Sequence, residues 1–424
     1  MTTAITLAID GDRLNHTLAQ LGKIGKLPQG GVQRIAYSRE DLLARELVQD
    51  WMVEAGMTIC IDAAGNIIGT YPGQQDNQPA LAIGSHIDTV PCGGRYDGAL
   101  GVIAGIEVVR VLNENQIRLA HPVEVIVFTD KEGAMLGSKA MSGTVVHDPE
   151  YYRSQEGIAI QTCLERLGGN WDKLTTAQRT RGEIAAFVEL HVEQGGALDS
   201  FGQDIGIVEG IVNENHYAIA VVGRANHAGT TPMHLRRDAL VAASQVVLAV
   251  QTLIKETPGE HVATVGVMQV WPNAAGIVPG RVEMTLDIRD LSDTKVEELV
   301  AQLQLQLRAI ATTTQTEITL TPTLHIASTL TVPKIQDAIT LSCQQLGLNC
   351  TYLPSRATHD AQEIGRFTDM GMIFVPSAAG ISHAEEEYTS PEHCIQGANV
   401  LLHTLLQLDS IYPLSESTSH NDEG

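Results

Sequence analysis

Three histidines and two acidic residues are the side chains with the clearest capacity for chemistry in this sequence. They follow the carboxyl ends of successive apolar segments: His86, Asp97, Glu132, His191 and His383. Open α/β sheets bind their ligands at the carboxyl ends of the strands. Imidazoles and carboxylates without thiolates suit a pair of zinc, manganese or cobalt ions bridged by one carboxylate. Such a pair lowers the pKa of bound water and polarises a carbonyl group.

A structural alternative has to be weighed against this metal site. Each histidine taken singly fits a structural or surface position better than a ligand position. The recurrence of such side chains after successive apolar segments is what favours the metal site, and the pattern by itself leaves both alternatives open. Asp88 is a further catalytic candidate, because a strand would place it on the same side as His86. An acid beside a ligating histidine fixes its tautomer and raises its basicity.

The elements that must position these side chains alternate between apolar strands and helices. Strands are predicted at residues 80–87, 123–129, 185–191 and 372–376. Helices are predicted at residues 99–112, 338–347 and 391–408. Ser38 is a favourable N-cap for an additional helix that stops at Gly56, and a hairpin is predicted directly after it. The alternation predicts an α/β domain with a mixed, mainly parallel sheet flanked by helices on both faces.

The middle of the chain has a different pattern. Strands are predicted at residues 216–222, 262–271, 282–288 and 316–324, and helices at 238–255 and 292–310. The order is β-α-β-β-α-β, which is the ferredoxin-like split motif. We therefore expect a small inserted domain at residues 213–327, and a discontinuous larger domain at residues 1–212 and 328–412. The polar tail at residues 413–424 is predicted to be disordered.

Charge and cysteine usage exclude several classes of protein. The 424 residues include 50 acidic and 27 basic side chains, a formal net charge of −23. A field of that sign repels phosphate backbones and anionic lipid, so we expect neither nucleic acid nor membrane partners. The N-terminus has no basic segment followed by a long apolar run, and no signal peptide or transmembrane helix is expected. The six cysteines form no CxxC pair, which is typical of reduced thiols in a cytoplasmic protein.

Several segments resemble the M20-type metallopeptidase superfamily. They are GSHIDTVPCGGRYDGALGV, ELHVEQG, GRANHAGTTPM, DIRD, HDAQ and FVPSAAGISH, in the family's order between about residues 40 and 408. Within the superfamily they are similar to the hydantoinase/carbamoylase branch of N-carbamoyl-L-amino-acid hydrolases and allantoate amidohydrolases. The resemblance implies a homodimer, in which a di-metal catalytic domain carries an inserted lid domain that dimerises.

Ligand and substrate roles also follow from the resemblance. One ion would be held by His86, Asp97 and His191, and the other by Glu132, His383 and a bridging Asp97. His227 matches the lid histidine that reaches the partner subunit's site and stabilises an oxyanion. Arg289 matches an arginine that grips a substrate carboxylate, and the remaining substrate-binding candidates are Gln194, Asn273 and His359.

This sequence departs from the family pattern at the position of the general base. Where the family has Glu-Glu-Gly, this chain has Lys131, Glu132 and Gly133, so the metal ligand is kept and a cation replaces the base. An ammonium cannot accept a proton. Lys131 could serve only as a neutral amine, which two nearby divalent ions would favour, or the ammonium could repel the second ion.

Smaller departures lie in the expected substrate region. Gly276 occupies a position where the family usually has a substrate-binding asparagine. It lies four residues after Pro272, in the segment that also contains Asn273. Arg356 and Thr358 stand at positions that are usually glycine.

The function implied is a metal-dependent amidohydrolase for small ureido or amide substrates that carry a carboxylate. N-carbamoyl amino acids or allantoate-like ureides are the expected substrates, attacked by a metal-bridging hydroxide. Lys131 leaves an alternative open: a catalytically impaired relative, or a variant substituted to trap a complex, that binds ligand without turnover.

Overall fold

The chain forms two compact units. The computed structural model describes residues 7–75, 78–152, 154 and 156–414. Unit 1 comprises Met1–Gly210 and Leu330–Gly424, and unit 2 comprises Ile211–Thr329. The sequence-based boundaries of the inserted domain are residues 213 and 327. The tail expected to be disordered lies outside the described residues from residue 415 onward, and its disorder stays a prediction.

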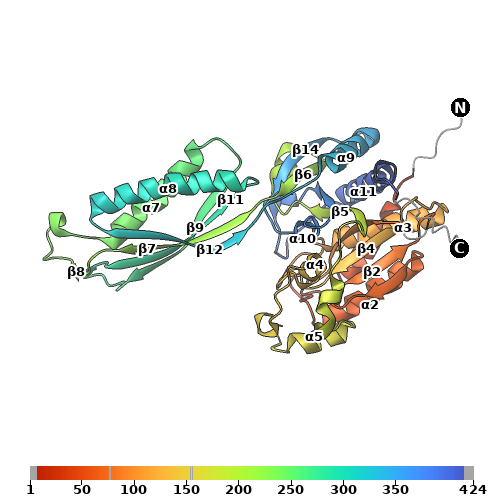
Figure 1. Cartoon of the computed structure of the whole chain (residues 1–424), viewed down its shortest axis with the longest axis horizontal. Helices are drawn as coiled ribbons and strands as arrows, with labels where there is room; N and C mark the ends of the chain where they lie inside the picture. The colour runs from red at the N-terminus through yellow and green to blue at the C-terminus, as the bar shows by residue number, and fades with distance from the viewer. Residues whose placement is uncertain (1–6, 76–77, 153, 155, 415–424) are drawn as a thin grey trace, which may run out of the picture. The chain divides into compact units, whose positions relative to one another are not determined.

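A nine-stranded mixed sheet forms the centre of unit 1 (Figure 1). Its order is β1-β2-β4-β3-β5-β15-β6-β13, and β14 pairs with β6. The central strands β4, β3, β5 and β15 are parallel, and the pairs β1–β2, β2–β4 and β15–β6 are antiparallel. The bounds are β1 Thr58–Ile61, β2 Ile67–Tyr71, β3 Ala80–His86, β4 Val123–Phe128, β5 Ile184–Val192, β6 Ile205–Ile211, β13 Thr329–Leu330, β14 Cys350–Ser355 and β15 Asp369–Val375.

Helices cover both faces of this sheet. Every residue of β3 and β4 is buried, and because side chains alternate between the two faces of a strand, neither face is open to water. The α-helices are α1 Gly11–Leu21, α2 Arg39–Glu54, α3 Ala99–Glu114, α4 Leu136–Ser142, α5 Ile160–Leu167, α6 Ala197–Phe201, α9 Pro333–Leu346, α10 Asp360–Ile364 and α11 Pro391–Ile411. The 3-10 turns of unit 1 are η1 Pro149–Tyr151, η2 Trp171–Ala177 and η4 Ala378–Gly380. The predicted fold class, a mainly parallel sheet flanked by helices, is confirmed.

Helix α3 packs unusually closely against β5, at a glycine. A Cβ atom on Gly101 would lie 2.3 Å from the backbone oxygen of Leu190. We expect Gly101→Ala to lower the free energy of unfolding by about 2 kcal/mol, because strand and helix backbones must separate. Denaturant unfolding measures this change. Gly266→Ala is the matched control, because no heavy atom lies within 4 Å of its added Cβ. Equal stability of the two variants would contradict the close approach.

Unit 2 is a four-stranded antiparallel sheet with two long helices on one face (Figure 1). The strand order is β12-β7-β11-β9, and the short strands β8 and β10 form a separate pair. The bounds are β7 Glu214–Val222, β8 Asn226–His227, η3 Met233–Leu235, α7 Ala239–Glu256, β9 Val262–Trp271, β10 Ile277–Val278, β11 Arg281–Arg289, α8 Asp293–Thr314 and β12 Glu317–Ile326. The element order confirms the predicted ferredoxin-like motif.

Helix α7 is long and apolar enough to pass a length-and-composition test for a membrane span. Its apolar side is used within unit 2, where Ala242, Val246 and Val250 are buried in the core with Val282 and Leu286 of β11. A helix that buries one stripe against a sheet is ordinary for a domain core. The expected absence of a membrane partner stays a prediction.

Candidate metal centre

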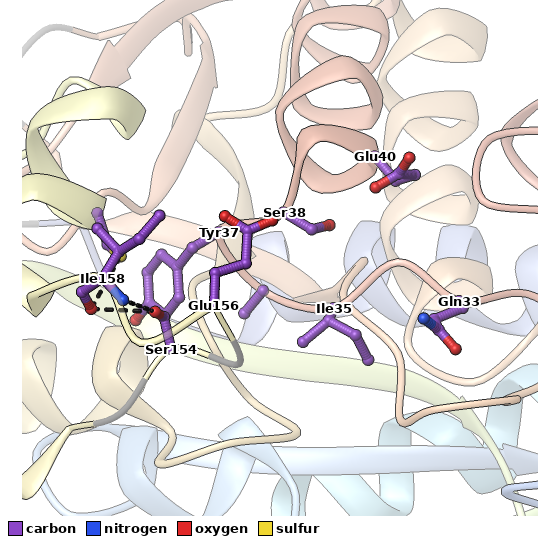
Figure 2. Close-up of a pocket in the computed structure, with 10 residues that line it drawn as sticks. Gln33, Ile35, Tyr37, Ser38, Glu40, Ser154, Glu156 and Ile158 are labelled. Carbon is purple, nitrogen blue, oxygen red and sulfur yellow. Dashed lines mark hydrogen bonds between the residues drawn. The ribbon is translucent and has the colours of Figure 1, made fainter.

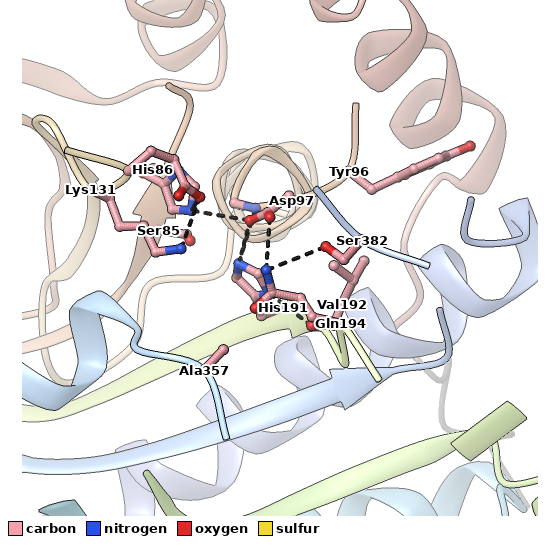
Figure 3. A network of polar contacts seen from close by, with 12 residues as sticks. Ser85, His86, Tyr96, Asp97, Lys131, His191, Val192, Gln194, Ala357 and Ser382 are labelled. Carbon is pink, nitrogen blue, oxygen red and sulfur yellow. Dashed lines mark hydrogen bonds and ion pairs between the residues drawn. The ribbon is translucent and has the colours of Figure 1, made fainter. Parts of the chain in front are cut away.

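The five predicted ligands come together at one edge of the unit 1 sheet. His86 is the last residue of β3, His191 is the penultimate residue of β5, and Asp97 lies two residues before α3. Glu132 follows β4, and His383 follows β15. Since β3, β4, β5 and β15 run parallel, their carboxyl ends meet at the same edge of the sheet. Figure 3 shows His86 and His191 directed at Asp97.

Two buried histidines face one oxygen of Asp97. The Nε2 atoms of His86 and His191 lie 3.4 and 3.2 Å from Oδ1 of Asp97. Their Nδ1 atoms lie 2.9 Å from the Asp88 carbonyl oxygen and 2.8 Å from the Val192 carbonyl oxygen, respectively. A carbonyl only accepts, so each Nδ1 carries a proton and Nε2 is the nitrogen available to a metal ion. This tautomer is the one that a metal ion requires at Nε2.

The second predicted group is Asp97, Glu132 and His383, and protein donors already contact two of its oxygens. Nε2 of His383 lies 3.1 Å from Oδ2 of Asp97 and 3.6 Å from Oε1 of Glu132. The same two oxygens accept hydrogen bonds within the protein: Lys131 Nζ donates to Oε1 of Glu132 at 2.9 Å, and the Gln194 amide donates to Oδ2 of Asp97 at 2.8 Å. His383 is half exposed, whereas the other histidines are fully buried.

Donor chemistry decides which group fits a metal ion. Among the described residues, Nε2 of His86 and Oδ1 of Asp97 are buried and make no hydrogen bond. Orphaned buried acceptors that face one another are what a cation would satisfy. The group of His86, Asp97 and His191 therefore fits a divalent ion. The group of Asp97, Glu132 and His383 offers oxygens that protein donors already contact.

Asp88 has a different position from the predicted one. Strand β3 ends at His86, so Asp88 lies beyond the strand, and its backbone carbonyl is closer to His86 Nδ1 than its carboxylate is, at 2.9 against 3.6 Å. The carboxylate accepts instead from the backbone N–H of Glu132 at 2.9 Å and of Lys131 at 3.4 Å. The Asp88 carbonyl therefore accepts from Nδ1 of His86, and the carboxylate, which also lies beside that ring, holds the turn that presents Glu132. A catalytic role for Asp88 stays a prediction.

Lys131 is a buried cation in this site. Burial lowers the pKa of Lys131, but the carboxylates of Asp97 and Glu132 outweigh it and raise that pKa above its ordinary range. The Lys131 ammonium and the three facing imidazoles in turn hold the pKa of Asp97 well below its usual range, against the effect of burial. The two carboxylates thus favour an ammonium at Lys131.

The carboxylate of Glu387 links the segment that carries Asp97 to the segment that carries His383. The sequence pattern did not predict this role. Its Oε1 accepts from the backbone N–H groups of Tyr96 at 3.0 Å and Asp97 at 3.1 Å. Its Oε2 accepts from the Ser382 hydroxyl at 3.1 Å. Burial raises the pKa of this carboxyl group, which lies beside Asp97. Glu387 thus fixes the residue next to His383 to the segment that presents Asp97.

We expect Glu387→Gln to weaken metal binding by about 10- to 100-fold, the usual cost of removing a group that orients a ligand. The amide keeps the volume of the side chain but can accept through one oxygen only. Titration of the metal-stripped protein with Mn²⁺ measures the affinity. Glu386→Gln is the control, because Glu386 is exposed. Equal Mn²⁺ affinity in both variants would show that Glu387 does not position Asp97.

Two of the predicted substrate residues lie against the ligands. Gln194 adopts a positive φ of 59° and directs its amide at Asp97 and His383. His359 is fully buried, and its ring centroid lies 4.5 Å from that of His191. Burial and the neighbouring His191 lower the pKa of His359 well below its usual value, which favours the neutral imidazole.

The other predicted substrate residues belong to unit 2. His227 is exposed, and its Nδ1 accepts from the backbone N–H groups of Gly229 at 3.0 Å and Thr230 at 3.2 Å. Its proton is therefore on Nε2, which makes Nε2 a donor. Arg289 is held by Asp287, with Nη2 2.9 Å from Oδ2, and by Glu214 at 3.3 Å. The exposed Asn273 has a positive φ of 56°, a conformation that asparagine tolerates.

Two small cavities of unit 1 share part of their lining, and the second reaches the centre at Glu132. One of about 140 Å³ is lined by Tyr37, Ser38, Glu40 and Ser154, among others, and Figure 2 shows the Ser154 hydroxyl bonded to the backbone of Ile158. The other, of about 120 Å³, is lined by Asp88 and Glu132 and shares Tyr37 and Ser154 with the first. Sites for small organic ligands are typically about 300 to 1,000 Å³, so these cavities suit water better than a ureido acid.

The chain belongs to peptidase family M20/M25/M40, whose model matches residues 82–407. An N-carbamoyl-L-amino acid amidohydrolase of Geobacillus stearothermophilus is 39% identical over 405 residues, 94% of this chain and 99% of that protein. An allantoate amidohydrolase of Bacillus subtilis is 33% identical over 394 residues, 92% of this chain and 95% of that protein. A solved amidase of the hydantoinase/carbamoylase family from Burkholderia multivorans has a TM-score of 0.88 at 34% identity, and covers 95% of this chain and 98% of that one. The family resemblance seen in the sequence is thereby confirmed.

Proposed function

We propose that this protein is a metal-dependent amidohydrolase that cleaves carbon–nitrogen bonds of N-carbamoyl amino acids or allantoate-like ureides. The observation that carries the proposal is the convergence of His86 and His191 on Asp97, with both imidazoles in the metal-binding tautomer. The names of the similar proteins support hydrolysis of small ureido compounds. Because those proteins are named for hydrolysis, the alternative of a relative that binds without turnover gains no support.

A divalent metal ion, when bound, would activate water and polarise the substrate carbonyl. The residues of the chain supply the remaining functions. The Nε2–H of His227 is a hydrogen-bond donor for negative charge that develops on the carbonyl oxygen, and the backbone donors at Nδ1 fix it in that role. The guanidinium of Arg289 is suited to a substrate carboxylate, with Asp287 and Glu214 fixing its plane.

The proposal also covers the oligomeric state and the cellular location of the protein. We infer a homodimer in which the lid histidine His227 serves the partner subunit's site. We also infer a cytoplasmic location, which the six free cysteines support.

A substrate panel tests the proposal. The purified protein is loaded with Mn²⁺ or Zn²⁺ and given N-carbamoyl-L-amino acids, allantoate, N-acyl amino acids and dipeptides. We expect turnover of the ureido compounds and at least tenfold lower kcat/KM for the dipeptides. Preferential cleavage of dipeptides, or no turnover of any ureido compound with either metal, would contradict the proposed substrate class.

A further inference from the structure

The two ligand groups of the centre share Asp97 but differ in what already contacts their ligand atoms. The groups are His86, Asp97 and His191, and Asp97, Glu132 and His383. Among the described residues, the first group contains buried acceptors without hydrogen bonds, namely His86 Nε2 and Asp97 Oδ1. In the second group, Lys131 donates to Glu132 and Gln194 donates to Asp97. His191 Nε2 of the first group also accepts, from the uncharged backbone N–H of Gly98 at 3.1 Å, so the difference is that the Lys131 ammonium contacts a ligand atom of the second group only.

The ammonium of Lys131 is the less dispensable of these two donors. The Lys131 side chain is 4% exposed, and its Nζ lies 2.9 Å from Oε1 of Glu132. An ammonium that left this carboxylate would lose its hydrogen-bonded partner while still buried, which is strongly unfavourable. The Gln194 amide is uncharged, so its departure from Asp97 would cost less.

An ion at the second group would have to share Glu132 with this ammonium. Charges of the same sign repel each other more strongly where protein replaces water. Glu132 is itself largely buried, with 11% of its side chain exposed, and little water is available to screen the repulsion. The first group has no such cation in hydrogen-bond contact with its ligand atoms among the described residues.

We propose that this chain binds a single divalent ion, at His86, Asp97 and His191, and that the Lys131 ammonium takes the place of a second ion beside Glu132 and His383. The proposal rests on the metal dependence of the proposed function and deepens it. One positive charge of the centre is then supplied by the protein and cannot be removed by a chelator.

Counting bound Mn²⁺ tests this assignment without any substrate. The metal-stripped protein is equilibrated with Mn²⁺, and ions per chain are measured by native mass spectrometry and by calorimetric titration. We expect one ion for the natural chain and two for Lys131→Met, which removes the charge and frees Glu132. Lys173→Met is the matched control, because Lys173 is exposed, and it should keep one ion.

A second pair of variants locates the ion. We expect His191→Ala to lose the ion and His383→Ala to keep it, with Mn²⁺ affinity changed less than tenfold. Two ions of similar affinity in the natural chain would overturn the proposal, even if Lys131→Met failed to fold. So would one ion in a folded Lys131→Met variant, or loss of the ion in His383→Ala alone. Failure of the substrate panel with one bound ion would instead contradict the proposed function and leave the ion count standing.

Discussion

Replacing His191 with alanine is expected to lower kcat/KM for the best ureido substrate by on the order of 10³-fold. Nε2 of His191 lies 3.2 Å from Oδ1 of Asp97 and accepts from the uncharged Gly98 backbone N–H at 3.1 Å, so it is unprotonated and can bind an ion that replaces this donor. Loss of one of three ligands removes the ion, whose stabilisation of the transition state is worth several kcal/mol. A thousandfold loss corresponds to about 4 kcal/mol.

The matched control for this variant is His147→Ala. His147 is exposed in the same unit, and its replacement should change kcat/KM less than twofold. Circular dichroism and the thermal midpoint of the metal-free proteins show whether His191→Ala keeps the fold. A folded His191→Ala variant with more than a tenth of the natural kcat/KM would contradict the assignment of His191 as a ligand.

Replacing Arg34 with methionine is expected to lower the free energy of unfolding by about 3 kcal/mol. Arg34 is fully buried, and its guanidinium donates to the carbonyl oxygens of Ile87 at 2.6 Å, Leu21 at 3.2 Å and Ile24 at 3.1 Å. Methionine has a similar length but no donor, so buried carbonyls lose their partners at about 1 to 3 kcal/mol each, offset in part by the desolvation cost of the charge.

Replacing Arg34 should also weaken metal binding at the centre. The carbonyl of Ile87 lies between His86 and Asp88, so we expect Mn²⁺ affinity to fall together with stability. Arg34→Lys should recover little, because one ammonium cannot reach three separate carbonyls in a fixed plane. Arg39→Met, at an exposed position of α2, is the control in denaturant unfolding. A loss below about 0.5 kcal/mol in Arg34→Met would contradict the buried network.

Much of the framework was predictable because local signals agree with the tertiary structure. The apolar runs of β3, β4 and β5 are buried on both faces, and such runs are distinctive in sequence. Ser38 caps its helix as predicted, by accepting from the N–H of Asp41, and Ser292 caps α8 in the same way, by accepting from the N–H of Lys295. Where the local sequence and the fold favour the same structure, residue pattern alone is informative.

Other elements depend on distant partners and gave no usable local signal. Strand β6 was not among the predicted strands, and it pairs with β15 from far along the chain. The short strand β14 is formed in the same way, against β6. Strand formation depends on neighbours in the sheet more than on intrinsic preference.

The sequence predicted which residues of the candidate site are metal ligands, but not which residues hold those ligands in place. Histidines and acids at strand ends are visible in sequence, but the hydrogen bonds that orient them are not. Glu387 is one of three consecutive glutamates, and only the fold distinguishes the buried one that holds Asp97 from its exposed neighbours. Arg34 is equally inconspicuous, since its partners come from separate segments. The substrate roles of Gln194 and His359 stay predictions.

The most direct test of the central claim is ammonia release from an N-carbamoyl-L-amino acid by metal-stripped protein, before and after Mn²⁺ is added. A metal-dependent amidohydrolase should release almost no ammonia when stripped, and should recover at least a hundredfold higher rate with Mn²⁺. His191→Ala should stay near the rate of the metal-stripped protein under both conditions. Ammonia release that is the same with and without the ion, or that persists in His191→Ala, would contradict the account.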